Sequence, residues 1–323
     1  MKRRNLLSIV ASTGLVAAFE RPNASAVPAT PLPLVATIGQ IGDLLRAVGG
    51  DRFEPSVLMG QGIDPHSYRP TRSDVLTLRR AAAIFANGLR LEAQLDPLLD
   101  RLAGERPLIR LAERLPTDRL IARPEFPGSA DPHCWMDVAL WRALLPIVRD
   151  ELGRLDPTGA TIFAERARAY DAELDGLDRY ARAVLGTVPP AARVLVTAHD
   201  AFGYFGRAYG FEVHGVQGLS TESEAGLAQI ERLVRLLVER AIPAVFVESS
   251  VAERNVLALV EGAAARGHRV RVGGRLFSDA MGSPGSYEGT YIGMIDHNVT
   301  VIARSLGGSA PARGLNGLLA AIG

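Results

Sequence analysis

The sequence is poor in cysteine and in long apolar runs, and its charges nearly cancel. Cys134 is the only cysteine in 323 residues, so an intrachain disulfide is impossible. Lys and Arg number 36 against 35 Asp and Glu, and no basic stripe forms, so we do not expect a nucleic-acid partner. Beyond the N-terminal region, no apolar run reaches the length of a membrane helix.

The first 26 residues have the pattern of a secretory signal peptide. A positive start at residues 1–4 precedes an apolar stretch at 6–19 that is too short to span a membrane. Residues 24–26, Ala-Ser-Ala, fit a cleavage site. Arg3-Arg4 also fits a twin-arginine signal, so both export routes stay open, and a buried N-terminal helix is the alternative. Since the stretch has no cysteine, we expect export to the periplasm without a lipid anchor.

Strands and helices alternate along the rest of the chain. Segments with helical spacing separate the predicted strands, and this alternation predicts α/β units with parallel sheets. Capping boxes are expected at Thr71–Asp74 and at Thr221–Glu224, the second before a helix that carries Leu227. The short buried runs typical of strands lie at residues 34–37, 53–59, 83–86, 108–111, 193–197, 244–247 and 268–272.

The longest helical pattern begins with Asp156 as the N-cap and Pro157 at the first helical position, and it continues to Leu185 without a further proline. About 29 residues of helix would span roughly 43 Å, enough to join two domains. Two shorter helices broken at Gly176 are the alternative. Pro189-Pro190 then marks a boundary. We therefore expect an N-terminal lobe at residues 27–155, a connecting helix at 156–186 and a C-terminal lobe at 187–323.

Three of the six histidines stand beside an aspartate. His66 and His133 end identical Asp-Pro-His tripeptides, and His199 precedes an aspartate at the end of a predicted strand. Imidazole is a common ligand of divalent metals, and α/β sheets bind ligands at the carboxyl ends of strands. A carboxylate on the far ring nitrogen would fix the ring. The candidate ring partners, with turn and cap roles as the alternative, are Asp64, Asp131 and Asp200.

Other polar residues have weaker patterns. Glu248 ends a predicted strand and is either a further partner of the site or a solvated side chain. Cys134 follows His133, so it is either a metal ligand or a small buried residue beside the site, and we favour the second role. The remaining histidines match no motif and are interpreted as surface or core residues: His214, His268 and His297.

Ordered motifs across nearly the whole mature chain make it resemble a known family. The sequence is similar to the TroA-like zinc/manganese solute-binding proteins of ABC importers. Three motifs contain a histidine of the set above, and three further segments complete the resemblance. The six motifs are Gly62-Ile-Asp-Pro-His-Ser-Tyr-Arg-Pro-Thr71, Asp131-Pro-His-Cys-Trp-Met-Asp137, Thr197-Ala-His-Asp-Ala-Phe-Gly-Tyr-Phe205, Gly218-Leu-Ser-Thr-Glu-Ser-Glu-Ala225, Phe277-Ser-Asp-Ala-Met-Gly282 and Gly289-Thr-Tyr-Ile-Gly-Met294.

The resemblance implies a fold, a site and a partner. It implies two α/β lobes joined by one long backbone helix, with the metal in the cleft between them. It implies that His66 and His133 bind from the first lobe, and that His199 and Asp279 bind from the second. The cargo would be one divalent ion, Mn²⁺ or Zn²⁺, delivered by a monomeric receptor to an ABC permease in the inner membrane. Bound imidazoles must be neutral, so we expect affinity to fall below about pH 6.

Two departures from the family pattern bear on the metal. The His-rich loop of many zinc-specific members is absent between the first two motifs, and His199 stands where many manganese-specific members have Glu. Imidazole suits Zn²⁺, whereas oxygen ligands suit Mn²⁺, so both ions stay open.

Two other functions remain alternatives. A zinc hydrolase would use three histidines and an activated water, but a fourth protein ligand would remove the open position. The chain also has no H-E-x-x-H helix and no G-x-S-x-G elbow. An adhesin is weaker because no repeats are present. We therefore predict a binding protein and not an enzyme.

Overall fold

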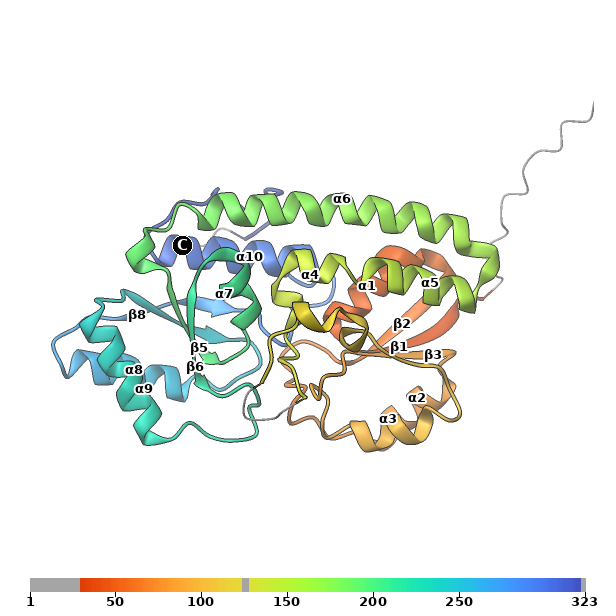
Figure 1. The fold of residues 1–323 in the computed structure, drawn as a ribbon, viewed down its shortest axis with the longest axis horizontal. Coiled ribbons are helices and arrows are strands. Elements are labelled where there is room, and N and C mark those ends of the chain that lie inside the picture. Colours follow the sequence, from red (N-terminus) through yellow and green to blue (C-terminus); the bar gives the residue numbers. More distant parts are fainter. Residues whose placement is uncertain (1–29, 124–127, 321–323) are drawn as a thin grey trace, which may run out of the picture.

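The computed structural model describes residues 30–123 and 128–320, so the predicted signal peptide lies outside the described residues. Two lobes stand side by side beneath a long helix that runs along the whole upper edge (Figure 1). Within the described ranges, no helix is long and apolar enough to cross a membrane. The predicted fold class, two parallel α/β lobes with one backbone helix, is confirmed.

The N-terminal lobe is built on a four-stranded parallel sheet of order β2-β1-β3-β4. All four strands were predicted, because each is a short apolar run bounded by turn residues. Helix α2 begins with the expected capping box, in which Thr71 and Asp74 exchange hydrogen bonds. The elements of this lobe are β1 (Leu32–Ile38), α1 (Gly39–Gly49), β2 (Phe53–Met59), α2 (Arg72–Arg80), β3 (Ala83–Ala86), α3 (Asp96–Leu102), β4 (Leu108–Arg110), α4 (Val138–Arg142) and α5 (Leu145–Leu155).

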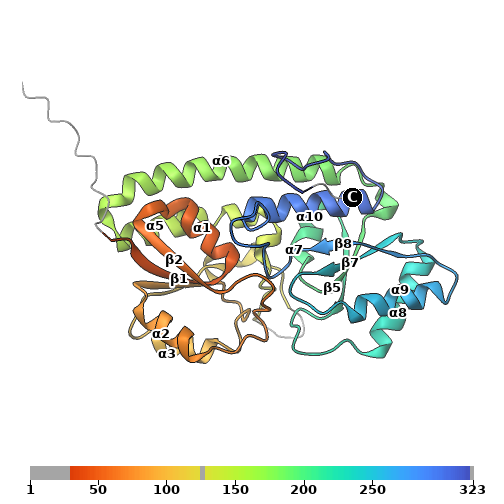
Figure 2. The ribbon, with the colours of Figure 1, turned by 180° about the vertical axis from the view of Figure 1, so that it is seen from behind.

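The C-terminal lobe contains two parallel strand pairs, β5-β6 and β7-β8, and β5 also contacts β7. Helices α8 and α9 cover the outer side of these strands, away from the long backbone helix (Figures 1 and 2). The elements of this lobe are β5 (Val194–His199), α7 (Gly203–Tyr209), β6 (Glu212–Gln217), α8 (Leu227–Glu239), β7 (Ala244–Glu248), α9 (Arg254–Ala264), β8 (Arg271–Leu276) and α10 (Tyr291–Ser305).

The connecting helix α6 (Ala160–Leu185) is continuous over 26 residues, so the alternative of a break at Gly176 is wrong. At about 1.5 Å per residue it is roughly 39 Å long. It packs against α1, α4 and α5 of the first lobe and against α7 and α10 of the second. One rigid rod thus contacts both lobes. The lobe boundaries at residues 155/156 and 186/187 stay a prediction.

A half-buried carboxylate joins the backbone helices. Asp43 on α1 accepts hydrogen bonds from the Tyr170 hydroxyl on α6 and from the backbone N–H of Tyr291, the first residue of α10. Burial raises the pKa of Asp43, although these bonds oppose that rise. A negative charge is also favoured at the N-terminus of a helix. This contact ties both lobes to α6 on the side opposite α8 and α9.

The apolar core is shared between the lobes. One buried cluster extends from the N-terminal sheet through α6 to residues of the second lobe such as Phe205, Phe246 and Ile295. A second cluster fills the space between α8, α9 and the strands of the C-terminal lobe. Close packing resists deformation, so a continuous core limits how far the lobes can separate.

Several local predictions were wrong for identifiable reasons. The helical spacing of residues 138–152 indicates one helix, but the structure has two, α4 and α5, and Pro146 stands at the start of the second. The capping box expected at Thr221 does not form, because α8 begins six residues later with Gly226 as its N-cap. Strand β6 was missed because its residues are mostly half-exposed. Strand β8 lies C-terminal to its predicted position and includes Gly273-Gly274, which resemble a loop in sequence.

Candidate metal centre

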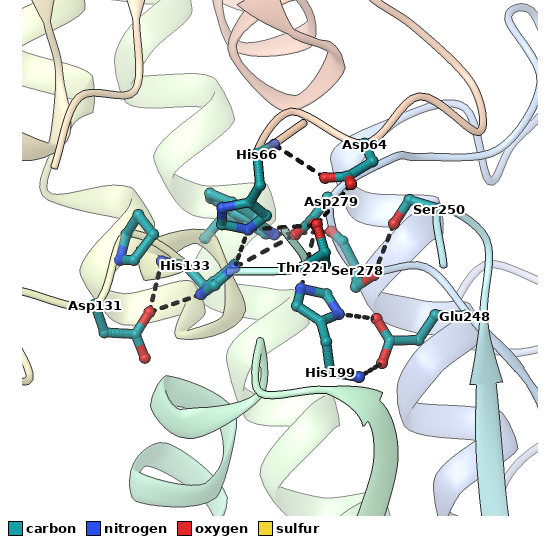
Figure 3. Close-up of polar contacts among 12 residues, drawn as sticks. Asp64, His66, Asp131, His133, His199, Thr221, Glu248, Ser250, Ser278 and Asp279 are labelled. Carbon is teal, nitrogen blue, oxygen red and sulfur yellow. Dashed lines mark hydrogen bonds and ion pairs between the residues drawn. The ribbon is translucent and has the colours of Figure 1, made fainter. Parts of the chain in front are cut away.

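Four side chains from the two lobes meet in the cleft (Figure 3). His199 is the last residue of β5, and Asp279 lies in the loop after β8, so both stand at the carboxyl ends of parallel strands. His66 lies in the loop between β2 and α2, and His133 in the loop before α4. The topology therefore brings residues that are up to 213 positions apart to one point.

The spacing of the four side chains suits a small cation. One ligand atom from each residue lies within 4.8 Å of the others. Nε2 of His66 is 3.2 Å from Nε2 of His133, and Nε2 of His199 is 3.1 Å from Oδ2 of Asp279. The Asp279 oxygens lie 3.7 Å from Nε2 of His66 and 3.5 Å from Nε2 of His133. A tetrahedral ion with bonds of about 2.0–2.2 Å separates its ligand atoms by about 3.3–3.6 Å, close to these values.

The polar atoms at the centre of the site are buried without partners. All four side chains are buried, and His133 and His199 are fully so. Nε2 of His199 and both oxygens of Asp279 have no hydrogen-bond partner among the described residues. A buried polar atom without a partner costs about 1–3 kcal/mol. A cation bound to these atoms would remove that cost, so the residues fit a metal site.

Carboxylates orient two of the three rings. Nδ1–H of His133 donates to Asp131 over 2.8 Å, and Nδ1–H of His199 donates to Glu248 over 2.5 Å. Backbone N–H groups of the same histidines also donate to these carboxylates. Because an ionised carboxylate can only accept, the hydrogen is on Nδ1 and Nε2 faces the centre. Both carboxylates thus aim a nitrogen lone pair at the position that an ion would occupy.

The other two candidate aspartates do not contact a ring. Asp64 accepts the backbone N–H of His66 over 2.9 Å, and its second oxygen accepts bonds from Ser67 and Thr221. Asp200, though adjacent to His199, makes no described side-chain hydrogen bond and lines a cavity of about 640 Å³ beside the site. Sequence adjacency therefore identified Asp131 as a ring partner, but not the partner of His199.

The three imidazoles and the carboxylate shift one another's pKa. Burial lowers the pKa of His66 to about 4, with Asp279 opposing and the other two imidazoles adding to the shift. Burial also disfavours charge on His199, but the carboxylates of Glu248 and Asp279 outweigh it and raise its pKa well above the usual range. Burial raises the pKa of Asp279, and its histidine neighbours overcome this and hold it well below its ordinary value.

Two donors from the N-terminal lobe fix the segment that carries Asp279. Nε2–H of Gln40 donates to the backbone carbonyls of Ser278 and Asp279, each over 3.2 Å. The indole N–H of Trp135 donates to the Ser278 carbonyl over 3.0 Å. This role of Gln40 is not predictable from the sequence, because a glutamine at the start of a helix carries no signal of it.

The remaining candidates lie outside the centre. The Cys134 thiol is buried beside Asn87, and burial raises its pKa, so it is a protonated core residue as favoured above. His214 pairs with Glu212. His268 and His297 each contact a backbone carbonyl, of Ile242 and Arg275 respectively.

Comparison with known proteins identifies the family. The family model of the zinc-uptake complex component A, periplasmic (ZnuA), matches residues 34–305. The zinc-binding protein TroA of Treponema pallidum is 42% identical over 301 residues, which cover 93% of this chain and 96% of that protein. The manganese-binding lipoprotein MntA of Bacillus subtilis is also 42% identical, over 275 residues that cover 85% of this chain and 90% of that protein.

Solved structures agree with the sequence comparisons. The structure of the periplasmic zinc-binding protein TroA from Treponema pallidum aligns with a TM-score of 0.83 at 43% identity. The alignment covers 85% of this chain and 99% of that chain. This chain therefore belongs to the ZnuA family, as a TroA-like solute-binding protein.

Proposed function

We propose that this chain is the receptor of a metal importer, which captures one divalent cation in the cleft and delivers it to an ABC-type permease. The observation that carries the proposal is the convergence of His66, His133, His199 and Asp279 from both lobes. Among the described residues, Nε2 of His199 and both Asp279 oxygens are buried without a hydrogen-bond partner. These four residues are the proposed ligands. The expected setting, a monomer exported to the periplasm with its permease in the inner membrane, is part of the same proposal.

The donor set bears on the choice of metal. Three imidazole nitrogens and a carboxylate suit Zn²⁺, and nitrogen-rich sites bind Zn²⁺ more tightly than Mn²⁺. The two relatives at 42% identity are named as zinc-binding and manganese-binding. We therefore propose Zn²⁺ or Mn²⁺ as the cargo, with Zn²⁺ the tighter ligand of the isolated protein.

The hydrolase alternative finds no support. A catalytic zinc keeps a position open for water, whereas the four proposed ligands, one of them with two available oxygens, would fill the coordination shell of a bound ion. The relatives are named as binding proteins.

Removal of one proposed ligand tests the function directly. The binding free energy of Zn²⁺ at structural sites is about 10–16 kcal/mol. One ligand of four therefore accounts for roughly 3 kcal/mol, which corresponds to more than a hundredfold in affinity. We expect wild type to bind one zinc per chain and His199→Ala to lose at least that factor, measured by competition with a chelator. His214→Ala, a histidine on the neighbouring strand β6, is the control and should bind like wild type. Equal binding by all three proteins would refute the proposed site.

The pH dependence of binding follows from the raised pKa of His199. The raised pKa means that His199 takes up a second proton, on Nε2 beside Asp279, at a higher pH than an ordinary histidine does. A cation must displace that proton, whereas His66, with its pKa of about 4, stays neutral. Lower pH favours the protonated ring, so affinity decreases by up to about tenfold per pH unit. Titrations at about pH 7.5 and about pH 5.5 should therefore differ by up to roughly a hundredfold. The affinity begins to decrease at a pH above the value of about 6 that is expected for an ordinary histidine ligand. Equal affinities at the two pH values would contradict ligation by His199.

The Glu248 carboxylate should strengthen the metal bond of His199. Replacement of such an outer partner typically weakens metal affinity by about 10–100-fold, and we expect Glu248→Gln to fall in that range. The matched control is Glu212→Gln, which alters an exposed carboxylate paired with His214 over 2.8 Å. Isothermal titration of both variants with zinc makes the comparison. If both variants lose affinity equally, or neither does, Glu248 has no specific role.

A further inference from the structure

His66 differs from the other two histidines in how it is held. The rings of His133 and His199 each donate Nδ1–H to a carboxylate, but no described contact joins Nδ1 of His66 to one. Asp64 contacts the backbone N–H of His66 instead. The position of the His66 ring therefore depends on where its loop lies.

The loop that carries His66 is bonded across the cleft. Asp64 Oδ2 accepts the Thr221 hydroxyl over 2.6 Å, and Thr221 belongs to the loop between β6 and α8 in the opposite lobe (Figure 3). The same oxygen accepts the Ser67 hydroxyl over 2.7 Å. One carboxylate thus joins the His66 backbone to the C-terminal lobe.

Thr221 is in turn anchored to the strand pair that delivers His199. Gln217, the last residue of β6, donates Nε2–H to the backbone carbonyls of Thr221 and Ser223, over 3.5 and 3.1 Å. Gln217 stands opposite His199 in the parallel register of β5 and β6. A chain of contacts therefore runs from His66 through Asp64 and Thr221 back to His199.

The Thr221 hydroxyl has no capping role in the helix that follows. Helix α8 begins at Leu227 with Gly226 as its N-cap, and no side chain caps it. The hydroxyl is directed to a carboxylate of the other lobe, and hydrogen bonds to charged acceptors are the stronger ones. A second contact across the cleft, from Gln94 to Glu222, joins exposed side chains and so contributes less.

We propose that Thr221 is a positioning residue for the metal centre. Its hydroxyl holds Asp64, and with it the His66 loop, in the closed position, and so slows the escape of bound cation. Opening of the cleft breaks this bond and releases His66 from its place beside the other three ligands. This inference rests on the proposed function, because it assigns a role in retaining the cargo of that same site.

The test measures zinc release from the full mature chain into excess chelator by stopped flow. Thr221→Val keeps the β-branched shape but removes the hydroxyl, and we expect release about 10–100-fold faster with little change in the association rate. Thr221→Ser restores a hydroxyl and should restore slow release. The control, Ser220→Ala, removes a hydroxyl from the same loop. The described hydrogen bond of that hydroxyl, to the backbone N–H of Glu222, stays within the loop, so the variant should release zinc like wild type.

The outcomes separate this inference from the proposed function. Unfolding midpoints of the metal-free proteins should agree, because the bond concerns closure and not the core. If wild type binds one zinc and Thr221→Val releases it at the wild-type rate, the positioning role is overturned and the receptor function stands. Equal acceleration in Ser220→Ala would also overturn it, since any change in the loop would then suffice. If wild type binds no zinc or manganese, both proposals fail.

Discussion

The structure depends on one electrostatic arrangement, in which the Asp279 carboxylate is surrounded by three imidazoles inside the protein. Nε2 of His199 and both Asp279 oxygens are buried with no hydrogen-bond partner in the described part of the chain, and the Nε2 atoms of His66 and His133 face each other at 3.2 Å. Nitrogen lone pairs at that distance repel unless a proton or a cation lies between them. A divalent ion bound among them would satisfy all of these atoms at once. Because two of the proposed ligands come from each lobe, such an ion would also join the lobes.

The scaffold explains why the site can be small and precise. Helix α6, the Asp43 contact that joins it to α1 and α10, and a core continuous between the lobes restrict their relative movement. The ligands lie on strand ends and on loops that neighbouring side chains fix, such as the Asp279 segment held by Gln40 and Trp135. With the lobes so restricted, the proposed release of the ion requires only a small movement that breaks the contact between Thr221 and Asp64.

The sequence was informative where a pattern is local and less so where a contact depends on tertiary structure. Parallel strands and the long helix follow from apolar periodicity, and the six family motifs marked the four converging side chains. The two identical Asp-Pro-His tripeptides nevertheless act differently, because Asp131 contacts the ring of His133 whereas Asp64 contacts the His66 backbone and Thr221. No spacing rule distinguishes them, since both carboxylates accept the backbone N–H of the following histidine and only the tertiary structure brings Thr221 of the opposite lobe to Asp64.

The carboxylate that binds the His199 ring could not be predicted from the sequence either. Asp200 is its neighbour in sequence, but Glu248, 49 residues away on β7, receives the Nδ1–H of His199 because β5 and β7 lie side by side.

X-ray absorption spectroscopy of the zinc-loaded protein tests most directly whether the three imidazoles and Asp279 enclose one ion. We expect a first coordination shell of three imidazole nitrogens and carboxylate oxygen, without water. A bound water, or fewer than three imidazoles around the zinc, would contradict it.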